Sequence, residues 1–191
     1  MIVKIKKGQH YDLKACSLIN RIRPRNTNKY FLRGYFSFSE KSNYVLLKEN
    51  GKVFLGWNKV GGINLQGWKE SDVNSGMMAW RDNPDAGLRE FVGYCNLASE
   101  NIYDKNPWLS VPLDDESEFM YEVYFDRSIL AVSLYRWDGE KFSHVHSDSI
   151  KYSLKPIPVE ISTWFGGPYP APNNIELNVR TEWVKKTNLV G

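Results

Sequence analysis

Alternation of apolar and polar residues with a period of two limits the fold of this chain more than any other feature of its sequence. Segments with this alternation, or rich in the β-branched and aromatic residues that strands favour, cover residues 2–7, 29–38, 43–60, 76–97, 118–147, 158–166 and 174–184. Turn signals separate these segments at Asn50-Gly51, between Asn83 and Gly87, and at Asp138-Gly139. The spacing predicts an all-β fold, a two-sheet antiparallel β-sandwich, because βαβ units would need helical segments between the strands. Short helical turns are expected only at residues 13–20 and 71–76.

The whole chain, residues 1–191, is predicted to be a single domain. Sandwiches of this length often fold undivided, and no linker or repeat breaks the sequence. A chain of this size buries enough surface to fold without a metal or a disulfide. Cys95 lies in an apolar run and is expected to be a buried free thiol, although the sequence leaves a pairing with Cys16 open.

Charge and hydropathy argue against two classes of partner. The net charge of +3 is too small to indicate a nucleic-acid partner. No segment has the run of about 18 apolar residues that a membrane span needs, and the first residues lack the apolar region of a signal peptide. We therefore expect no membrane partner and either a cytoplasmic or a virion-associated protein, for instance a phage-encoded one. A homo-oligomer stays open.

The later strands predict one apolar face and one face that mixes rings with polar groups. Tyr121, Val123 and Phe125 alternate with Glu122 and Tyr124, and the other strands repeat the pattern. Aromatic rings stack on the C–H faces of sugars, and amides, carboxylates and guanidinium groups bind sugar hydroxyls. We therefore predict a carbohydrate-binding face formed by Trp57, Tyr94, Asn96, Glu122, Tyr124, Tyr135, Trp164, Asn178 and Arg180. The alternative is that these rings lie under loops or in a subunit interface, where Tyr and Trp are also enriched.

Four stretches resemble, in order, the concanavalin A-like lectin/glucanase jelly roll: GQHYDL, WNKVGGINLQG, MMAWRDNPDAGLREFVGY and WFGGPYPAPNNIELNV. The resemblance implies two curved antiparallel sheets, with a glycan held on the concave sheet. Members of this superfamily include lectins, glycoside hydrolases, polysaccharide lyases and non-catalytic modules, so the fold by itself specifies no reaction.

The catalytic signatures of the superfamily are not matched. The acidic run LDDESEF lies before a strand and lacks the Glu-x-Asp-x-x-Glu spacing of laminarinase-like hydrolases, and GLREFVGY only partly resembles the first alginate lyase strand. We accordingly predict no catalytic residue, no metal and no cofactor. Three alternatives stay open: a hydrolase with the carboxylate pair Glu90 and Glu122, a lyase with His146 as base, and a metal site with His144 and His146 on one strand face.

The function that these observations favour is that of a non-catalytic carbohydrate-binding or surface-adhesion protein, whose partner is a glycan or polysaccharide. The first alternative is a carbohydrate-active enzyme, a polysaccharide lyase or glycoside hydrolase, that uses the same face. The second is a structural or protein-interaction module whose aromatic face is an interface.

Overall fold

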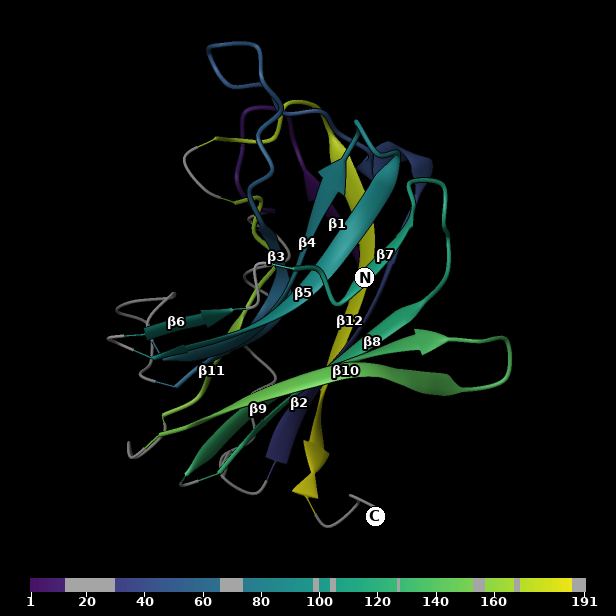
Figure 1. Cartoon of the computed structure of the whole chain (residues 1–191). Helices are drawn as coiled ribbons and strands as arrows, with labels where there is room; N and C mark the ends of the chain where they lie inside the picture. The colour runs from purple at the N-terminus through teal and green to yellow at the C-terminus, as the bar shows by residue number, and fades with distance from the viewer. Residues whose placement is uncertain are drawn as a thin grey trace.

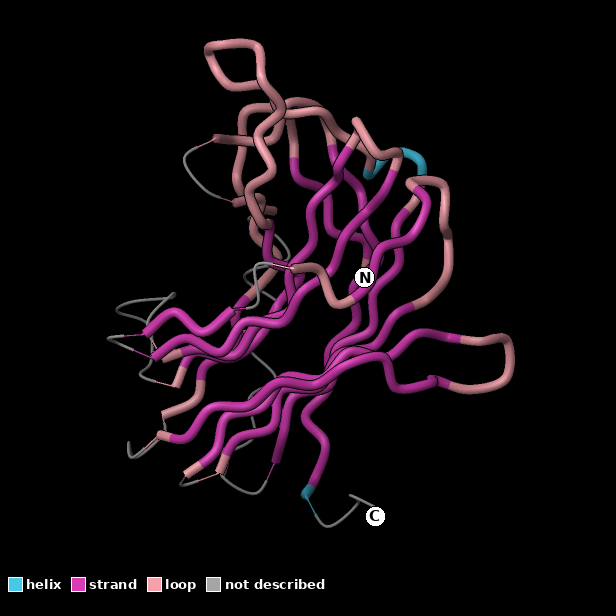
Figure 2. Tube along the Cα trace, in the orientation of Figure 1, coloured by secondary structure: helices cyan, strands magenta, loops and turns pink. Residues whose placement is uncertain are grey.

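The computed structural model describes residues 1–12, 30–65, 74–97, 100–103, 106–126, 128–152, 157–166 and 169–186. Two antiparallel sheets pack face to face, as Figures 1 and 2 show, and the prediction of an all-β sandwich is confirmed. Of the two helical turns expected from the sequence, residues 13–20 lie outside the described residues. In the second, the described part is an extended strand from Ser75 onward.

Sheet I has the strand order β1-β12-β2-β8-β9-β10. The first and last strands of the described chain are therefore neighbours. The bounds of its strands are β1 (Ile2–Ile5), β12 (Ile175–Lys185), β2 (Tyr30–Phe38), β8 (Phe119–Phe125), β9 (Ile129–Trp137) and β10 (Phe142–Lys151).

Sheet II has the strand order β11-β3-β4-β5-β6, and β7 pairs with the other end of β5. A single turn of 3-10 helix, η2 (Glu40–Ser42), follows β2. The bounds of the strands of sheet II are β11 (Val159–Ile161), β3 (Asn58–Asn64), β4 (Ser75–Asn83), β5 (Leu88–Leu97), β6 (Glu100–Tyr103) and β7 (Leu109–Pro112).

The core lies between the two sheets and uses the apolar side of each alternating strand. In β8, Phe119, Tyr121, Val123 and Phe125 are fully buried. They face the inward residues of β4 and β5, among them Trp80, which is fully buried as expected of a core tryptophan. Each such side chain stabilises the fold by roughly 1.5–3 kcal/mol through removal of apolar surface from water. Period-two alternation therefore identified the inward side of these strands correctly.

The segment around Asn50-Gly51 departs from the prediction. The sequence predicts two strands, but the residues between η2 and β3 make only the isolated bridge Leu47↔Val53, with Gly51 at a φ of 75°. A two-stranded ribbon alone is marginal in water, and Val45 and Leu47 remain more than half exposed. Asn50-Gly51 does form the predicted turn, but no third strand of the described chain pairs with the hairpin to stabilise it.

Cys95 is buried and free, as expected, and burial raises the pKa of its thiol to about 12. Cys16 lies outside the described residues. Within the described parts of the chain, no helix is both long and apolar enough to cross a membrane.

Glu160 is a carboxyl group that points into the sandwich. It lies on β11 opposite the inward-facing Ile63, and burial raises the pKa of its carboxyl to about 7, from a usual value of 4.5. The folded state therefore binds a proton more tightly than the unfolded chain. The free energy of unfolding is therefore unaffected by Glu160 at a pH below 4.5. It falls as the pH rises from 4.5 to about 7, and above that range the loss due to Glu160 stays constant.

We predict that Glu160→Gln abolishes this pH-dependent loss, because the amide carries no charge at any pH. Urea unfolding at pH 5 and pH 8 measures the effect. The natural protein should lose up to about 3 kcal/mol more than the variant between the two values. Equal losses in the two proteins would show that Glu160 is solvated and not buried.

Candidate functional site

The residues predicted to form one carbohydrate-binding face lie on opposite sides of the sandwich. Tyr94 and Asn96 project from the outer face of sheet II, the face directed away from sheet I, and Trp57 and Trp164 join them there. The remaining predicted residues project from the outer face of sheet I: Glu122, Tyr124, Tyr135, Asn178 and Arg180. The prediction of a single face is wrong, because alternation assigns residues to the two sides of a strand but does not tell which sheet the strand joins.

The same division separates the two carboxylates of the hydrolase alternative. Glu90 lies on the outer face of sheet II and accepts from Arg81 Nε at 2.5 Å. Glu122 lies on the outer face of sheet I and pairs with Arg33 at 2.6 Å. With the whole core between them, these carboxylates cannot act on one glycosidic bond.

The two histidines of the metal alternative are separated by a β-bulge. The pairing register of β10 with β9 shifts between His144 and His146, so His144 lies opposite Tyr135 and His146 lies opposite the inward Leu134. A bulge adds one residue and reverses the sides of the residues that follow. Across the described residues, no group of three metal-ligating side chains occurs.

The outer face of sheet II is concave. In Figure 1, β4 and β5 curve along their length, and this face lies inside the curve. Its centre is formed by the small or apolar residues Gly62, Met77, Ala79 and Val92, which are paired across β3, β4 and β5. We call this group the floor. Of these side chains, Met77, Ala79 and Val92 are at most 2% exposed, so the residues that border the floor cover it.

Lys59 and Tyr94 stand on two sides of the floor. Lys59 pairs across β3 and β4 with Ala79, and Tyr94 pairs across β4 and β5 with Met77. A register shift between Lys59 and Gly61 turns Lys59 to the outer face together with Gly62 and Asn64. Without this bulge, strict alternation would put Lys59 on the same side as the buried Ile63.

An ion pair and a tryptophan form the next row of this face. Arg81 binds Glu90 through Nε, donates from Nη1 to the backbone oxygen of Leu55 at 3.2 Å, and lies over the ring of Trp57 at 4.1 Å. Trp57 in turn meets the ring of Tyr94 edge-on, with 6.4 Å between centroids. The pair therefore holds Trp57 beside Tyr94, since cation and ring attract each other.

Trp164 forms the edge of the face next to Lys59. Its backbone N–H and C=O both bond with the backbone of Lys59, so the two side chains share one side. The rings of His10 and Tyr11 stack on the indole at 5.3 and 5.0 Å, and the indole stays 36% exposed. A stacked, half-open tryptophan at the rim of a polar face suits contact with a sugar ring.

The far end of the face is polar and buried. Asn64, Ser75 and Asn96 pair across β3, β4 and β5, and each is at most 7% exposed. The hydroxyl of Ser75 has no hydrogen-bond partner among the described residues. Polar groups are rarely buried without a role, so this row adds amide and hydroxyl groups to the candidate site.

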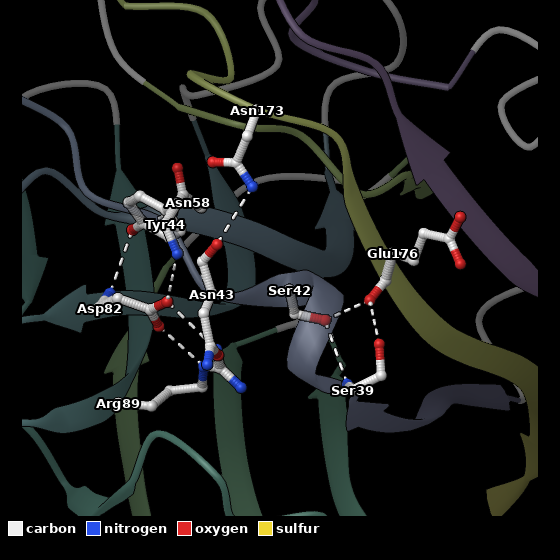
Figure 3. Close-up of polar contacts among 9 residues, drawn as sticks. All are labelled: Ser39, Ser42, Asn43, Tyr44, Asn58, Asp82, Arg89, Asn173 and Glu176. Carbon is white, nitrogen blue, oxygen red and sulfur yellow. Dashed lines mark hydrogen bonds and ion pairs between the residues drawn. The ribbon is translucent and has the colours of Figure 1, made fainter.

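A buried polar network fixes the segments that carry these side chains (Figure 3). Arg89 binds both carboxylate oxygens of Asp82, at 2.7 and 3.1 Å. The backbone N–H of Asp82 donates to the Tyr44 hydroxyl at 3.1 Å. In return, the backbone N–H of Tyr44 donates to the Asp82 carboxylate at 3.1 Å. Asn58 donates to the same hydroxyl at 2.6 Å and accepts the N–H of Gly166 at 2.8 Å. Through Tyr44 and Asn58, the ion pair of Arg89 and Asp82 is thereby linked to the start of β3 and to the segment that contains Trp164.

The network extends to the segment before β12. Arg89 also donates to Asn43 at 2.7 Å, and Asn173 donates to the backbone oxygen of Asn43 at 3.1 Å. The hydroxyls of Ser39 and Ser42 both bond to the backbone oxygen of Glu176, as Figure 3 shows. Three loops that are distant in sequence are therefore tied to one buried ion pair.

The outer face of sheet I has a different character. Glu122 accepts from Arg33 and, at 3.2 Å, from the hydroxyl of Tyr135, while Tyr35 donates to Glu182 at 3.0 Å. Burial and the nearby Glu122 charge raise the pKa of the Tyr135 hydroxyl, so this group stays protonated. The face is an open surface of paired charges and rings.

Comparison with known proteins supports the fold. No protein-family model and no curated protein matches the chain. Among solved structures, the alginate lyase vAL-1 from Chlorella virus is similar, with a TM-score of 0.53 and 12% sequence identity over 96% of this chain and 84% of that chain. At this identity the likeness shows the β-sandwich fold alone.

Some groups of the candidate site were not predicted from the sequence as site residues. Lys59 was missed because a bulge sets its direction, and Arg81 because its partners Glu90 and Trp57 depend on strand pairing. His10 could have been suspected, since it lies in GQHYDL, the first stretch from which the resemblance to a jelly roll was inferred. The resemblance to the jelly-roll superfamily did not assign a role to His10.

We predict that Tyr44→Phe destabilises the protein by about 2 kcal/mol, because it leaves the buried N–H groups of Asn58 and Asp82 without their acceptor. The ring contact with Phe165 is retained in this variant. Urea unfolding provides the measurement, with Tyr124→Phe as a half-exposed control expected to change stability little. A loss below about 0.5 kcal/mol for Tyr44→Phe would contradict the network's structural role.

Proposed function

We propose that this protein is a polysaccharide-cleaving enzyme of the lyase type that acts on an acidic polysaccharide at the outer face of sheet II. The observation that carries the proposal is the arrangement of Lys59 and Tyr94 around the floor of small or apolar side chains, with Trp57 and Trp164 beside them. A cation, a proton-transfer group and two sugar-stacking rings thus share one concave face.

The reaction that these groups suit is β-elimination on a uronate. A base removes the proton from the carbon next to the carboxylate. The electron pair forms a double bond to the neighbouring carbon, whose bond to the glycosidic oxygen breaks, and that oxygen takes a proton. The step needs a group that moves protons and a positive charge that stabilises the carboxylate as negative charge develops on it.

Tyr94 is the proposed proton-transfer group, and Lys59 the proposed partner of the substrate carboxylate. Arg81 is already paired with Glu90, so its proposed role is to position Trp57 against the sugar. The amides of Asn64 and Asn96 lie on the same face and offer donors to the carboxylate or hydroxyls.

The similar fold of an alginate lyase supports a lyase over a hydrolase, and the separation of Glu90 from Glu122 argues in the same direction. Assignment to the concanavalin A-like superfamily is part of this proposal. The non-catalytic carbohydrate-binding function that the sequence favoured is the alternative, and product formation distinguishes the two.

We predict that the protein releases unsaturated uronate products from alginate, detected by their ultraviolet absorbance. Tyr94→Phe should lower kcat by roughly 10²–10⁴-fold, because the ring contact with Trp57 remains and only the hydroxyl is lost. Lys59→Met should lower kcat/KM by about 10²-fold or more, with partial recovery in Lys59→Arg.

Matched controls come from the other sheet. Tyr124→Phe removes a half-buried hydroxyl from sheet I, and Lys151→Met removes an exposed charge at the end of β10. Both should keep the activity of the natural protein. Binding of alginate without release of unsaturated product would instead favour the non-catalytic function. Activity that survives Tyr94→Phe would contradict the proposed role of Tyr94.

A further inference from the structure

The outer face of sheet I carries a continuous row of rings. Trp137 meets Phe142 at 5.1 Å between centroids, Phe142 meets Tyr35 at 5.6 Å, and the guanidinium of Arg180 lies over the Tyr35 ring at 4.1 Å. These four residues come from β9, β10, β2 and β12. We call them the ring row.

The ring row is open to solvent. Trp137 is 38% exposed, Arg180 is exposed, and Tyr35 and Phe142 are half-buried. Rings left in water as a contiguous group are unfavourable unless a ligand or partner covers them. The candidate site on sheet II does not explain this row, since the core separates the two faces.

Hydrogen-bonding groups lie at both ends of the ring row. One hollow, beside Tyr35 and Arg180, is also lined by Ser37, Asn178 and Glu118. A second hollow, beside Trp137, is lined by Ser143, His144 and Asp138 among others. Rings that alternate with amide, hydroxyl, carboxylate and guanidinium groups match the C–H faces and hydroxyls of a sugar chain.

The row is held in place by the face around it. The Tyr35 hydroxyl donates to Glu182, and Arg33, on the same face of β2, binds Glu122. Asp138 accepts from the backbone N–H groups of Glu140 and Lys141, both at 3.0 Å, which fixes the turn between Trp137 and Phe142. Prior ordering of this kind lowers the entropy cost of binding.

At one end of the ring row, Arg180 offers a cation beside the carboxylate of Glu118, which lines the same hollow. Glu122 is paired with Arg33, and Glu176 is paired with Lys4 at 3.2 Å. No ion pair links Arg180 to another residue in the described parts of the chain. Its guanidinium lies over the Tyr35 ring, with Asn178 two residues away on the same face, so it can donate hydrogen bonds to a carboxylate.

We propose that the ring row is a second, non-catalytic binding surface for an acidic polysaccharide, on the opposite side of the sandwich from the candidate active site. The choice of polymer rests on the proposed function, whereas the binding surface itself does not. A long chain held on this face would remain near the protein between cleavage events, which raises its effective concentration.

Affinity electrophoresis in native gels that contain alginate tests this surface. The protein carries Tyr94→Phe throughout, so that cleavage does not consume the polymer. We expect alginate to retard it, and Trp137→Ala or Tyr35→Ala to raise the dissociation constant about tenfold each, the size of one strong ring contact. Ile129→Ala, an exposed residue at the other end of β9, should leave retardation unchanged.

Three outcomes would overturn the proposal. The first is retardation by alginate that neither Trp137→Ala nor Tyr35→Ala weakens, and the second is the absence of retardation. The third is a dimer in analytical ultracentrifugation that Trp137→Ala dissociates, because the row would then be an interface between copies of this chain.

The result is independent of the lyase assay. Retardation that depends on the ring row, in a protein whose natural form releases no unsaturated product, would support this surface and refute the proposed enzyme. Release of unsaturated product by the natural protein, without retardation that depends on the ring row, would support the proposed enzyme and refute this surface. Circular dichroism and unfolding midpoints of Trp137→Ala and Tyr35→Ala confirm that each variant is folded before its retardation is read.

Discussion

The buried ion pair between Arg89 and Asp82 is the interaction on which the rest of the structure depends. Both side chains are at most 1% exposed, so removal from water costs several kcal/mol per charge unless every donor and acceptor is satisfied. Tyr44 and Asn43 supply the missing partners, and Asn58 donates to the Tyr44 hydroxyl, so the segment after β2 is drawn onto the end of sheet II. Because Asn58 also binds Gly166, satisfying the pair sets the backbone on both sides of Lys59 and Trp164.

Much of the fold could be predicted from the sequence, because alternation reports local burial directly. The strands that carry Tyr121, Leu134 and Leu177 bury the expected sides. The candidate site could be predicted only in part, since it depends on which strands pair. Tyr94 and Tyr135 have the same alternation but belong to opposite faces, and one-residue bulges redirect Lys59 and His146. Bulges and sheet membership are set by long-range pairing, which a short window of sequence does not contain.

The two outer faces differ in ways that suit different tasks. On sheet II, a concave floor of small or apolar residues is bordered by Lys59 and Tyr94, and the amides at its far end are buried, which favours chemistry on a held substrate. On sheet I, Arg33 and Glu122 are paired, Arg180 lies over the Tyr35 ring, and rings lie open in a row, which favours reversible contact with a long chain. The fold is compatible with both tasks, so the side chains on each face, and not the fold, determine the function.

A crystal structure of the Tyr94→Phe protein with a bound acidic oligosaccharide would show whether the outer face of sheet II holds the substrate. We expect sugar density over Ala79 and Val92, with a carboxylate near Lys59 and a sugar ring against Trp57 or Trp164. Density confined to the outer face of sheet I, with the floor of sheet II empty at saturating ligand, would contradict this expectation.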